Sequence, residues 1–222
     1  MIDKLQDQLV HGLGSDLELA YYNRNILWQL RVIHPRITEQ KSKAVIEQFN
    51  FMRDNSKINT VLYLSRVYDK PNNNNKTRCL EKLINQLISN KMSNAPAIIA
   101  EILWEEFKMK HLKAFKFLGG NIVKSDEFLA KVGCYITTTR ESNGAPLNKV
   151  KEWRDGFIAH NDSKKDDPSL TDIQIEELLI IAEAALSFIN DFLGIGASFN
   201  LRKPEGEFVE EIFSQLLSGS TN

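Results

Sequence analysis

The sequence has little of what several large classes of protein require. Its 222 residues include only 11 glycines and 6 prolines, too few for a collagen-like chain or a loop-rich all-β fold. Its apolar runs are short: the run Leu178–Ala182 is far below the roughly 20 residues that cross a bilayer. Asp3, Gln6 and Asp7 interrupt any apolar core at the N-terminus, so we expect no signal peptide, no membrane partner and a cytoplasmic protein.

The sequence also has few cysteines and almost no net charge. Cys79 and Cys134 are the two cysteines, and they form neither a disulfide framework nor a zinc site by themselves. We therefore expect two reduced, buried thiols. The 28 basic and 29 acidic residues give a net charge of −1, so a nucleic acid would have to be bound by a local basic patch.

The patterns that mark common cofactor and nucleophile sites are absent. The sequence contains no GxxxxGK[ST], GxGxxG, HExxH or GxSxG. Its four histidines, His11, His34, His111 and His160, lie far apart and lack the spacing of metal ligands. We expect neither a metal nor a cofactor.

Helical periodicity is present along nearly the whole chain. Leu80, Leu83, Ile84 and Leu87 follow the i, i+3, i+4, i+7 template. The same pattern extends over 175–192, where further apolar residues off the stripe predict a central helix buried on several sides. Sustained alternation of period two is absent, so we predict an all-α fold, an antiparallel bundle of about eight helices.

Capping residues and helix breakers predict where the helices begin and end. Ser15 and Glu18 fit a capping box, and Pro35 disfavours helical geometry at the residue before it. The first predicted helix therefore runs from Ser15 to about His34.

The next boundaries follow the same logic. Thr38 is expected to cap a long helical stretch that reaches Asp69, with a joint around 54–56. Gly119–Gly120 should end a helix that begins near Asn94.

Further along the chain, 142–146 reads as a turn and 171–174 as a capping box. The last predicted helix covers 205–217. We interpret 1–222 as a single all-α domain, with this C-terminal helix as an appendage that docks on the bundle or on a partner.

One predicted helix, 145–161, carries polar groups on its apolar face. On a helical wheel of ~100° per residue, Arg154 and His160 lie on either side of Phe157. A guanidinium on a packing face is costly unless it is paired or lies in a cleft. Arg154 is therefore a candidate for a site or an interface. The plainer alternative is that Arg154 pairs with a buried carboxylate and His160 caps the end of the helix.

The neighbours of this pair have two readings each. Asp155 lies away from Arg154 on the wheel and can pair with Lys151, one turn earlier. Asp162 follows the predicted helix end, where it either orients His160 or caps the loop. Lys151 belongs to a run of basic residues around Arg154, and such a run usually forms a solvated helix face.

A second charged block lies at the end of the stretch that reaches Asp69. Arg66 and Asp69 are three residues apart and can form a surface ion pair that anchors one helix to the next. Alternatively, Arg66 reaches a cleft and binds phosphate. Tyr68 lies on an apolar stripe and is expected in the core rather than in a base-stacking platform.

Two blocks resemble a known family. The segment Trp-Arg-Asp-Gly-Phe-Ile-Ala-His-Asn-Asp at 153–162 resembles the signature helix of the HEPN superfamily, in which a His follows an Arg within about two helical turns. Leu-Ser-Arg-Val-Tyr-Asp at 64–69, then Thr-Arg-Cys-Leu at 77–80, resembles the AbiU-type abortive-infection branch. The resemblance covers about 15–193, which would be the HEPN-like core.

The resemblance implies a metal-independent endoribonuclease of toxin or abortive-infection type. In such a reaction the RNA 2′-hydroxyl attacks the adjacent phosphate and leaves a 2′,3′-cyclic phosphate and a 5′-hydroxyl. His160 would transfer the protons, and Arg154 would stabilise the charge on the phosphorane oxygens. Asp155 would support this catalytic pair.

The resemblance also indicates partners. It implies RNA as substrate, with Arg66, Lys151 and Asp162 expected to contact it, and a homodimer in which two Arg…His helices share a cleft. An antitoxin or another defence-system partner stays open. Some HEPN toxins carry a modifiable Tyr where Asp162 stands, so we do not expect that form of control. The alternative function is a non-catalytic HEPN-like module that binds nucleic acid, a nucleotide or a protein, which the near-neutral charge leaves open.

Overall fold

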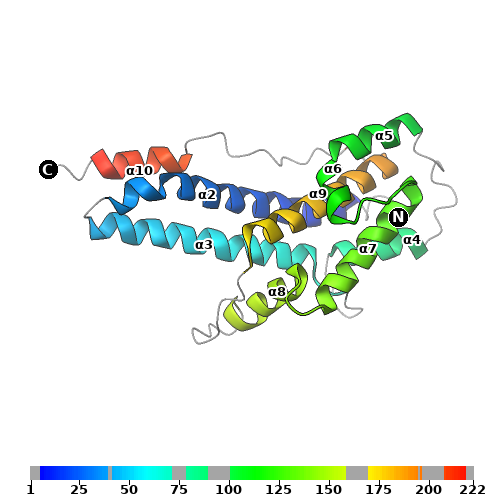
Figure 1. The fold of residues 1–222 in the computed structure, drawn as a ribbon, viewed down its shortest axis with the longest axis horizontal. Coiled ribbons are helices and arrows are strands. Elements are labelled where there is room, and N and C mark those ends of the chain that lie inside the picture. Colours follow the sequence, from blue (N-terminus) through cyan, green and yellow to red (C-terminus); the bar gives the residue numbers. More distant parts are fainter. Residues whose placement is uncertain are drawn as a thin grey trace.

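The computed structural model describes residues 6–39, 42–71, 79–89, 101–158, 170–194, 196 and 208–218. These residues form nine α-helices and two short π-helical segments, with no strand among them, which confirms the predicted all-α bundle (Figure 1). None of the described helices is both long and apolar enough to span a membrane. The elements are η1 (Leu9–Gly14), α2 (Ser15–Thr38), α3 (Lys43–Val67), α4 (Leu80–Ser89), α5 (Glu101–Lys110), α6 (Leu112–Phe117), α7 (Ser125–Glu141), α8 (Pro146–Trp153), η2 (Arg154–Ile158), α9 (Asp172–Leu193) and α10 (Phe208–Ser218).

Two long helices and one buried helix organise the molecule. Helices α2 and α3 run side by side along the longest axis, and α9 packs against both of them as well as against α6, α7 and α8 (Figure 1). The burial of α9 on several sides is as predicted, because Leu178, Ile181, Ala185 and Ile189 are fully buried. Its predicted capping box forms at Thr171 and Gln174, and Gly194 ends it with a φ of +61°.

The C-terminal end of α2 and the N-terminal end of α3, which follow each other in the chain, form a second, smaller core with α10. Helix α10 packs there through Val209 and Phe213, against apolar residues of α2 and α3 such as Ile33, Ile37 and Phe49. The predicted C-terminal helix is thus present from Phe208 onward and lies against the bundle.

Helix α2 begins at Ser15, as predicted, but the Ser15 side chain does not cap it, because the backbone before Ser15 is already helical in η1. The predicted end of this helix is wrong, and the second core explains why. Helix α2 continues through Pro35 to Thr38 instead of ending at His34. Ile33 and Ile37, on either side of Pro35, are both buried in the second core, and their burial stabilises the last turn against the lost hydrogen bond.

Helix α3 is continuous where a joint was predicted. It begins at Lys43 after Ser42, so Thr38 does not cap it, and it passes through 54–56 without a break. Polar side chains in this stretch bond back to the helix itself, as Thr60 Oγ1 does to the Ser56 carbonyl at 2.8 Å. Polar residues alone therefore did not signal a break.

The remaining predictions are mixed. The turn at 142–146 separates α7 from α8, and Gly119–Gly120 follow α6 with positive φ, as predicted. The helix before these glycines is interrupted at His111, and its predicted start near Asn94 lies outside the described residues. Cys79 is buried, which raises the pKa of its thiol, but Cys134 is exposed because it lies opposite the buried face of α7.

Candidate active site at the junction of α3 and α8

Helix α8 presents Arg154 at the edge of the core. Pro146 occupies its first turn, where a missing N–H is harmless, and Leu147, Val150 and Trp153 are buried against the bundle. Arg154 follows Trp153 directly and opens the π-helical segment η2. Its side chain is 32% exposed, so it lies half in the packing face and half in solvent.

Arg154 is held by two carboxylates. Its Nη1 donates to Asp69 Oδ1 at 2.9 Å, and its Nε donates to Asp155 Oδ1 at 2.9 Å. The plainer interpretation, a pair with a buried carboxylate, is right about the pair and wrong about the burial, because the Asp69 and Asp155 side chains are 32% and 49% exposed. The pair with Asp69 also joins the two sequence blocks, 64–69 and 153–162, that carry the family resemblance.

The contact of Asp155 separates its two readings. Its carboxylate accepts from Arg154, not from Lys151, so it lies beside the arginine that the resemblance expects it to support. The reason is that the backbone changes from α to π geometry at Arg154. A π turn holds more residues than an α turn, so a wheel of ~100° per residue fails beyond Trp153.

The predicted pair between Arg66 and Asp69 is also wrong. Arg66 Nη1 lies 3.4 Å from Asp16 Oδ1 of α2, and its guanidinium lies 5.2 Å from the centroid of the Tyr63 ring. Helix α3 ends at Val67, so Asp69 lies beyond it and the i, i+3 geometry of a helix does not apply. A role for Arg66 in binding RNA stays a prediction.

Asp69 is placed by its neighbours. Tyr68, buried as predicted, donates its hydroxyl to the Leu178 carbonyl of α9 at 2.6 Å. Burial and the nearby Glu177 raise the pKa of Tyr68 well above its ordinary value, so it stays a neutral donor. The Lys70 amide donates to Asp69 Oδ1 at 2.9 Å. The carboxylate therefore faces Arg154 from an anchored piece of backbone.

A second arginine, Arg140 of α7, secures the same backbone and was missed from the sequence. Its Nη2 donates to the Tyr68 carbonyl at 2.8 Å and lies 3.4 Å from the Asp69 carbonyl. Its Nη1 pairs with Glu81 of α4 at 2.5 Å, and its side chain is only 14% exposed. An arginine in the last turn of a predicted helix was the one available signal, because it suggests bonds to free carbonyl groups.

The electrostatics keep Arg154 charged. Partial burial lowers the pKa of its guanidinium, but the hydrogen bonds that it donates to Asp155 and Asp69 outweigh this and raise the pKa overall. One cation and two carboxylates leave the group of Arg154, Asp69 and Asp155, which we call the Arg154 cluster, with a net charge of −1. Among the described residues, no three His, Cys, Asp or Glu side chains are grouped so as to hold a metal ion.

The structure thus brings together two of the predicted site residues, Arg154 and Asp155, and adds Asp69 and Arg140. Lys151 is exposed on α8. His160 and Asp162 lie outside the described residues.

Comparison with known proteins gives one match. The HEPN AbiU2 family model, described as AbiU2, matches residues 2–195, slightly more than the stretch that carries the resemblance. No curated protein and no solved structure matches the chain.

Proposed function

The chain belongs to the AbiU2 family of HEPN proteins, and from that premise we propose that it is a metal-independent endoribonuclease of abortive-infection type. The observation that carries the proposal is the ion pair between Arg154 Nη1 and Asp69 Oδ1 at 2.9 Å. It joins the two family blocks at one place and fixes a charged guanidinium at the edge of solvent.

Arg154 is suited to stabilise a phosphorane. Its planar fork has five N–H donors, and the two carboxylates bond it at Nε and Nη1. The Nη2 donors can then bind a phosphate oxygen whose negative charge grows in the transition state. Asp69 and Asp155 act as positioning residues in this scheme, because they fix the plane of the guanidinium.

His160 supplies the proton transfers in this proposal. As a base it would take the proton from the 2′-hydroxyl, whose oxygen attacks the phosphorus. As an acid it would give a proton to the leaving 5′-oxygen, so that the products are a 2′,3′-cyclic phosphate and a 5′-hydroxyl. An imidazole with an ordinary pKa near 6.5 can serve in both roles close to neutral pH.

One observation favours the alternative of a non-catalytic module. The Arg154 cluster carries a net charge of −1, and two carboxylates already bond the Nε and Nη1 groups of the arginine. A binding module would use these pairs to hold α8 against α3, and replacing Arg154 would then lower stability or self-association without touching any cleavage.

An RNA cleavage assay in EDTA separates the two functions. The wild type is compared with His160→Ala, Arg154→Ala and Asp69→Asn. The control is Lys113→Ala, which replaces an exposed lysine of α6 that pairs with Glu176 of α9. All proteins are prepared alike, and folding is checked by circular dichroism.

We expect cyclic-phosphate ends from the wild type and the control. Loss of a positioned general acid–base group typically costs ~100- to 10,000-fold in rate, so His160→Ala should be nearly inactive. Equal cleavage by all folded variants, or no cleavage by any protein, would overturn the proposal in favour of the binding module. Sedimentation analysis of wild type and Arg154→Ala tests the homodimer in the same samples.

A further inference from the structure

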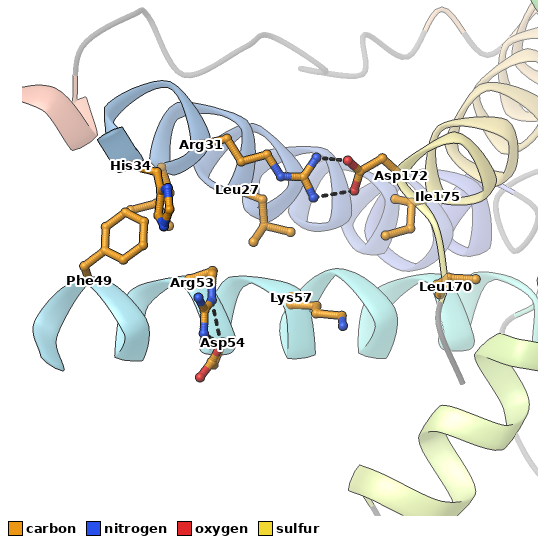
Figure 2. A pocket seen from close by; sticks show the side chains of 11 residues that line it. Leu27, Arg31, His34, Phe49, Arg53, Asp54, Lys57, Leu170, Asp172 and Ile175 are labelled. Carbon is orange, nitrogen blue, oxygen red and sulfur yellow. Dashed lines mark hydrogen bonds and ion pairs between the residues drawn. The ribbon is translucent and has the colours of Figure 1, made fainter. Parts of the chain in front are cut away.

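A pocket of about 410 Å³ lies away from the Arg154 cluster, between the middle of α2, the first half of α3 and the start of α9 (Figure 2). Its apolar lining comes from these three helices and from Leu170, two residues before α9, and consists of Leu27, Leu30, Phe49, Leu170 and Ile175. These five residues are buried, so the pocket has an apolar floor in which each element takes part. Its size lies within the ~300–1,000 Å³ typical of sites for small organic ligands.

The rim of this pocket is basic. Arg31 of α2 and Arg53 and Lys57 of α3 line it, against Asp54 and Asp172. Three cations and two carboxylates give a net charge of +1, opposite in sign to the Arg154 cluster. The start of α9, whose amide dipoles favour anions, adds to this potential.

The rim arginines are held by exchangeable pairs. Arg31 Nη2 donates to Asp172 Oδ1 at 2.7 Å, and Arg53 Nε donates to Asp54 Oδ1 at 3.0 Å (Figure 2). Arg31 also pairs through Nη1 with Asp172 Oδ2, so its pair is bidentate. The Arg53 side chain is 48% exposed and uses a single oxygen of Asp54, and exposed pairs of this second kind are worth little in water. An anion with matching geometry can therefore compete with the aspartates for the same forks.

We infer that this pocket binds a nucleotide through its phosphate. Arg53 and Lys57 are placed to receive the phosphate, and the apolar floor to receive the flat base. His34 adds an exposed ring at the rim, 5.5 Å from the Phe49 ring, on which a base can stack. The nucleotide is either part of an RNA chain or a free mononucleotide, and the first source rests on the function proposed above.

The position of Lys57 links the pocket to the Arg154 cluster. Its Nζ lies 5.5 Å from the centroid of the Trp153 ring, and Trp153 directly precedes Arg154. Lys57 and the end of α3 at Val67 are separated by about 15 Å along the helix axis. An RNA strand bound along α3 would thus meet the basic pocket first and the catalytic cluster next.

Binding is tested with probes that cannot be cleaved. A fluorescein-labelled 2′-O-methyl oligouridylate is titrated by anisotropy at several salt concentrations, and AMP is titrated by calorimetry. The variants are Arg53→Gln/Lys57→Gln and, as a matched control, Arg36→Gln/Lys113→Gln, which removes the same two charge types from exposed pairs outside the pocket. Because the oligonucleotide lacks a free 2′-hydroxyl, its binding does not depend on whether the protein is a nuclease.

If an RNA nucleotide occupies the pocket, the double variant should bind the oligonucleotide at least about tenfold more weakly. Its salt slope should fall by about 0.7, the contribution of one lost phosphate contact on a single strand. If a free mononucleotide occupies it, AMP binding is lost in the double variant while the oligonucleotide is unaffected. Neither change is expected in the control.

A second variant acts in the opposite direction. Asp54→Asn removes a competing carboxylate from the rim and should tighten binding of the same probe severalfold, which damage to the fold would not do. Equal affinities of wild type, double variant and Asp54→Asn for both probes would overturn the inference. That result would leave the cleavage assay, and hence the proposed activity, untouched.

Discussion

The Arg154 cluster and the basic pocket both contain arginine–carboxylate pairs, but these pairs differ in burial. At the C-terminal end of α3, Arg140 and Arg154 pair with carboxylates from other elements, and the Arg140 side chain is only 14% exposed. In the basic pocket, Arg31 and Arg53 pair with aspartates at the surface. A buried pair fixes the chain because breaking it leaves an unpaired charge, whereas an exposed pair costs little to open. The first region is therefore built for rigidity and the second for exchange with a ligand.

Replacing Arg140 should cause the largest loss of stability among these variants. Arg140→Ala leaves Glu81 without its partner and removes the donor from the Tyr68 and Asp69 carbonyls. We expect the free energy of unfolding to fall by about 3 kcal/mol, the range found when one partner of a buried pair is removed. Urea denaturation measures this. Arg36→Ala, which breaks an exposed pair with Glu210, should cost less than about 1 kcal/mol, and equal losses in both would contradict the distinction.

The comparison of stabilities also depends on pH, because His111, which lies outside both regions, contributes to the free energy of unfolding in a pH-dependent way. His111 is buried, with its ring tilted against that of Phe107 at a centroid distance of 4.6 Å, and burial, with help from Lys110, lowers its pKa to about 4. The unfolded chain takes up a proton near pH 6.5 and the folded chain only near pH 4. The free energy of unfolding therefore falls as the pH drops through this window, by about 2 kcal/mol at pH 5.

This contribution is measured as the difference between wild type and His111→Phe, in urea at pH 7.5 and at pH 5. The phenylalanine keeps the ring beside Phe107 and cannot take a proton. We expect the variant to lose less stability on acidification than the wild type. An identical loss in both proteins would show that His111 carries none of the effect.

Arg154→Ala tests the smallest difference in stability. Its two carboxylates are partly solvated, so we expect a loss of about 1 kcal/mol by urea denaturation, between the values for Arg140→Ala and an exposed pair. Arg53→Ala in the basic pocket is the matched comparison and should change stability by less than about 0.5 kcal/mol. If Arg53→Ala were the more costly of the two, the pocket would be a structural element and not an exchangeable one.

Features encoded within a few neighbouring residues were predictable. The α9 capping box and the 142–146 turn depend on local hydrogen bonds and backbone preferences, and they are where the pattern placed them. The continuation of α2 through Pro35 was not predictable from local sequence, because it depends on burial against α10, which is far away in the chain. A local rule fails where distant packing decides.

The site divides in the same way. The position of Arg154 on a packing face, and its need for a carboxylate, followed from the helical pattern. Its partner Asp69 did not, because the two are 85 residues apart. The contact of Asp155 with Arg154 was missed because the π turn was invisible in the pattern, and Arg140 because its partners lie 59 to 72 residues away.

The long separation between Asp69 and Arg154 has a consequence for how the protein folds. Helices α4 to α8 must reach their places before this pair can close, so the loop between its partners is ordered late. The α2–α3 hairpin is built from neighbours in the chain, so its contacts close a shorter loop and can form earlier. The two walls of the basic pocket that come from α2 and α3 would then be in place while the Arg154 cluster is still open.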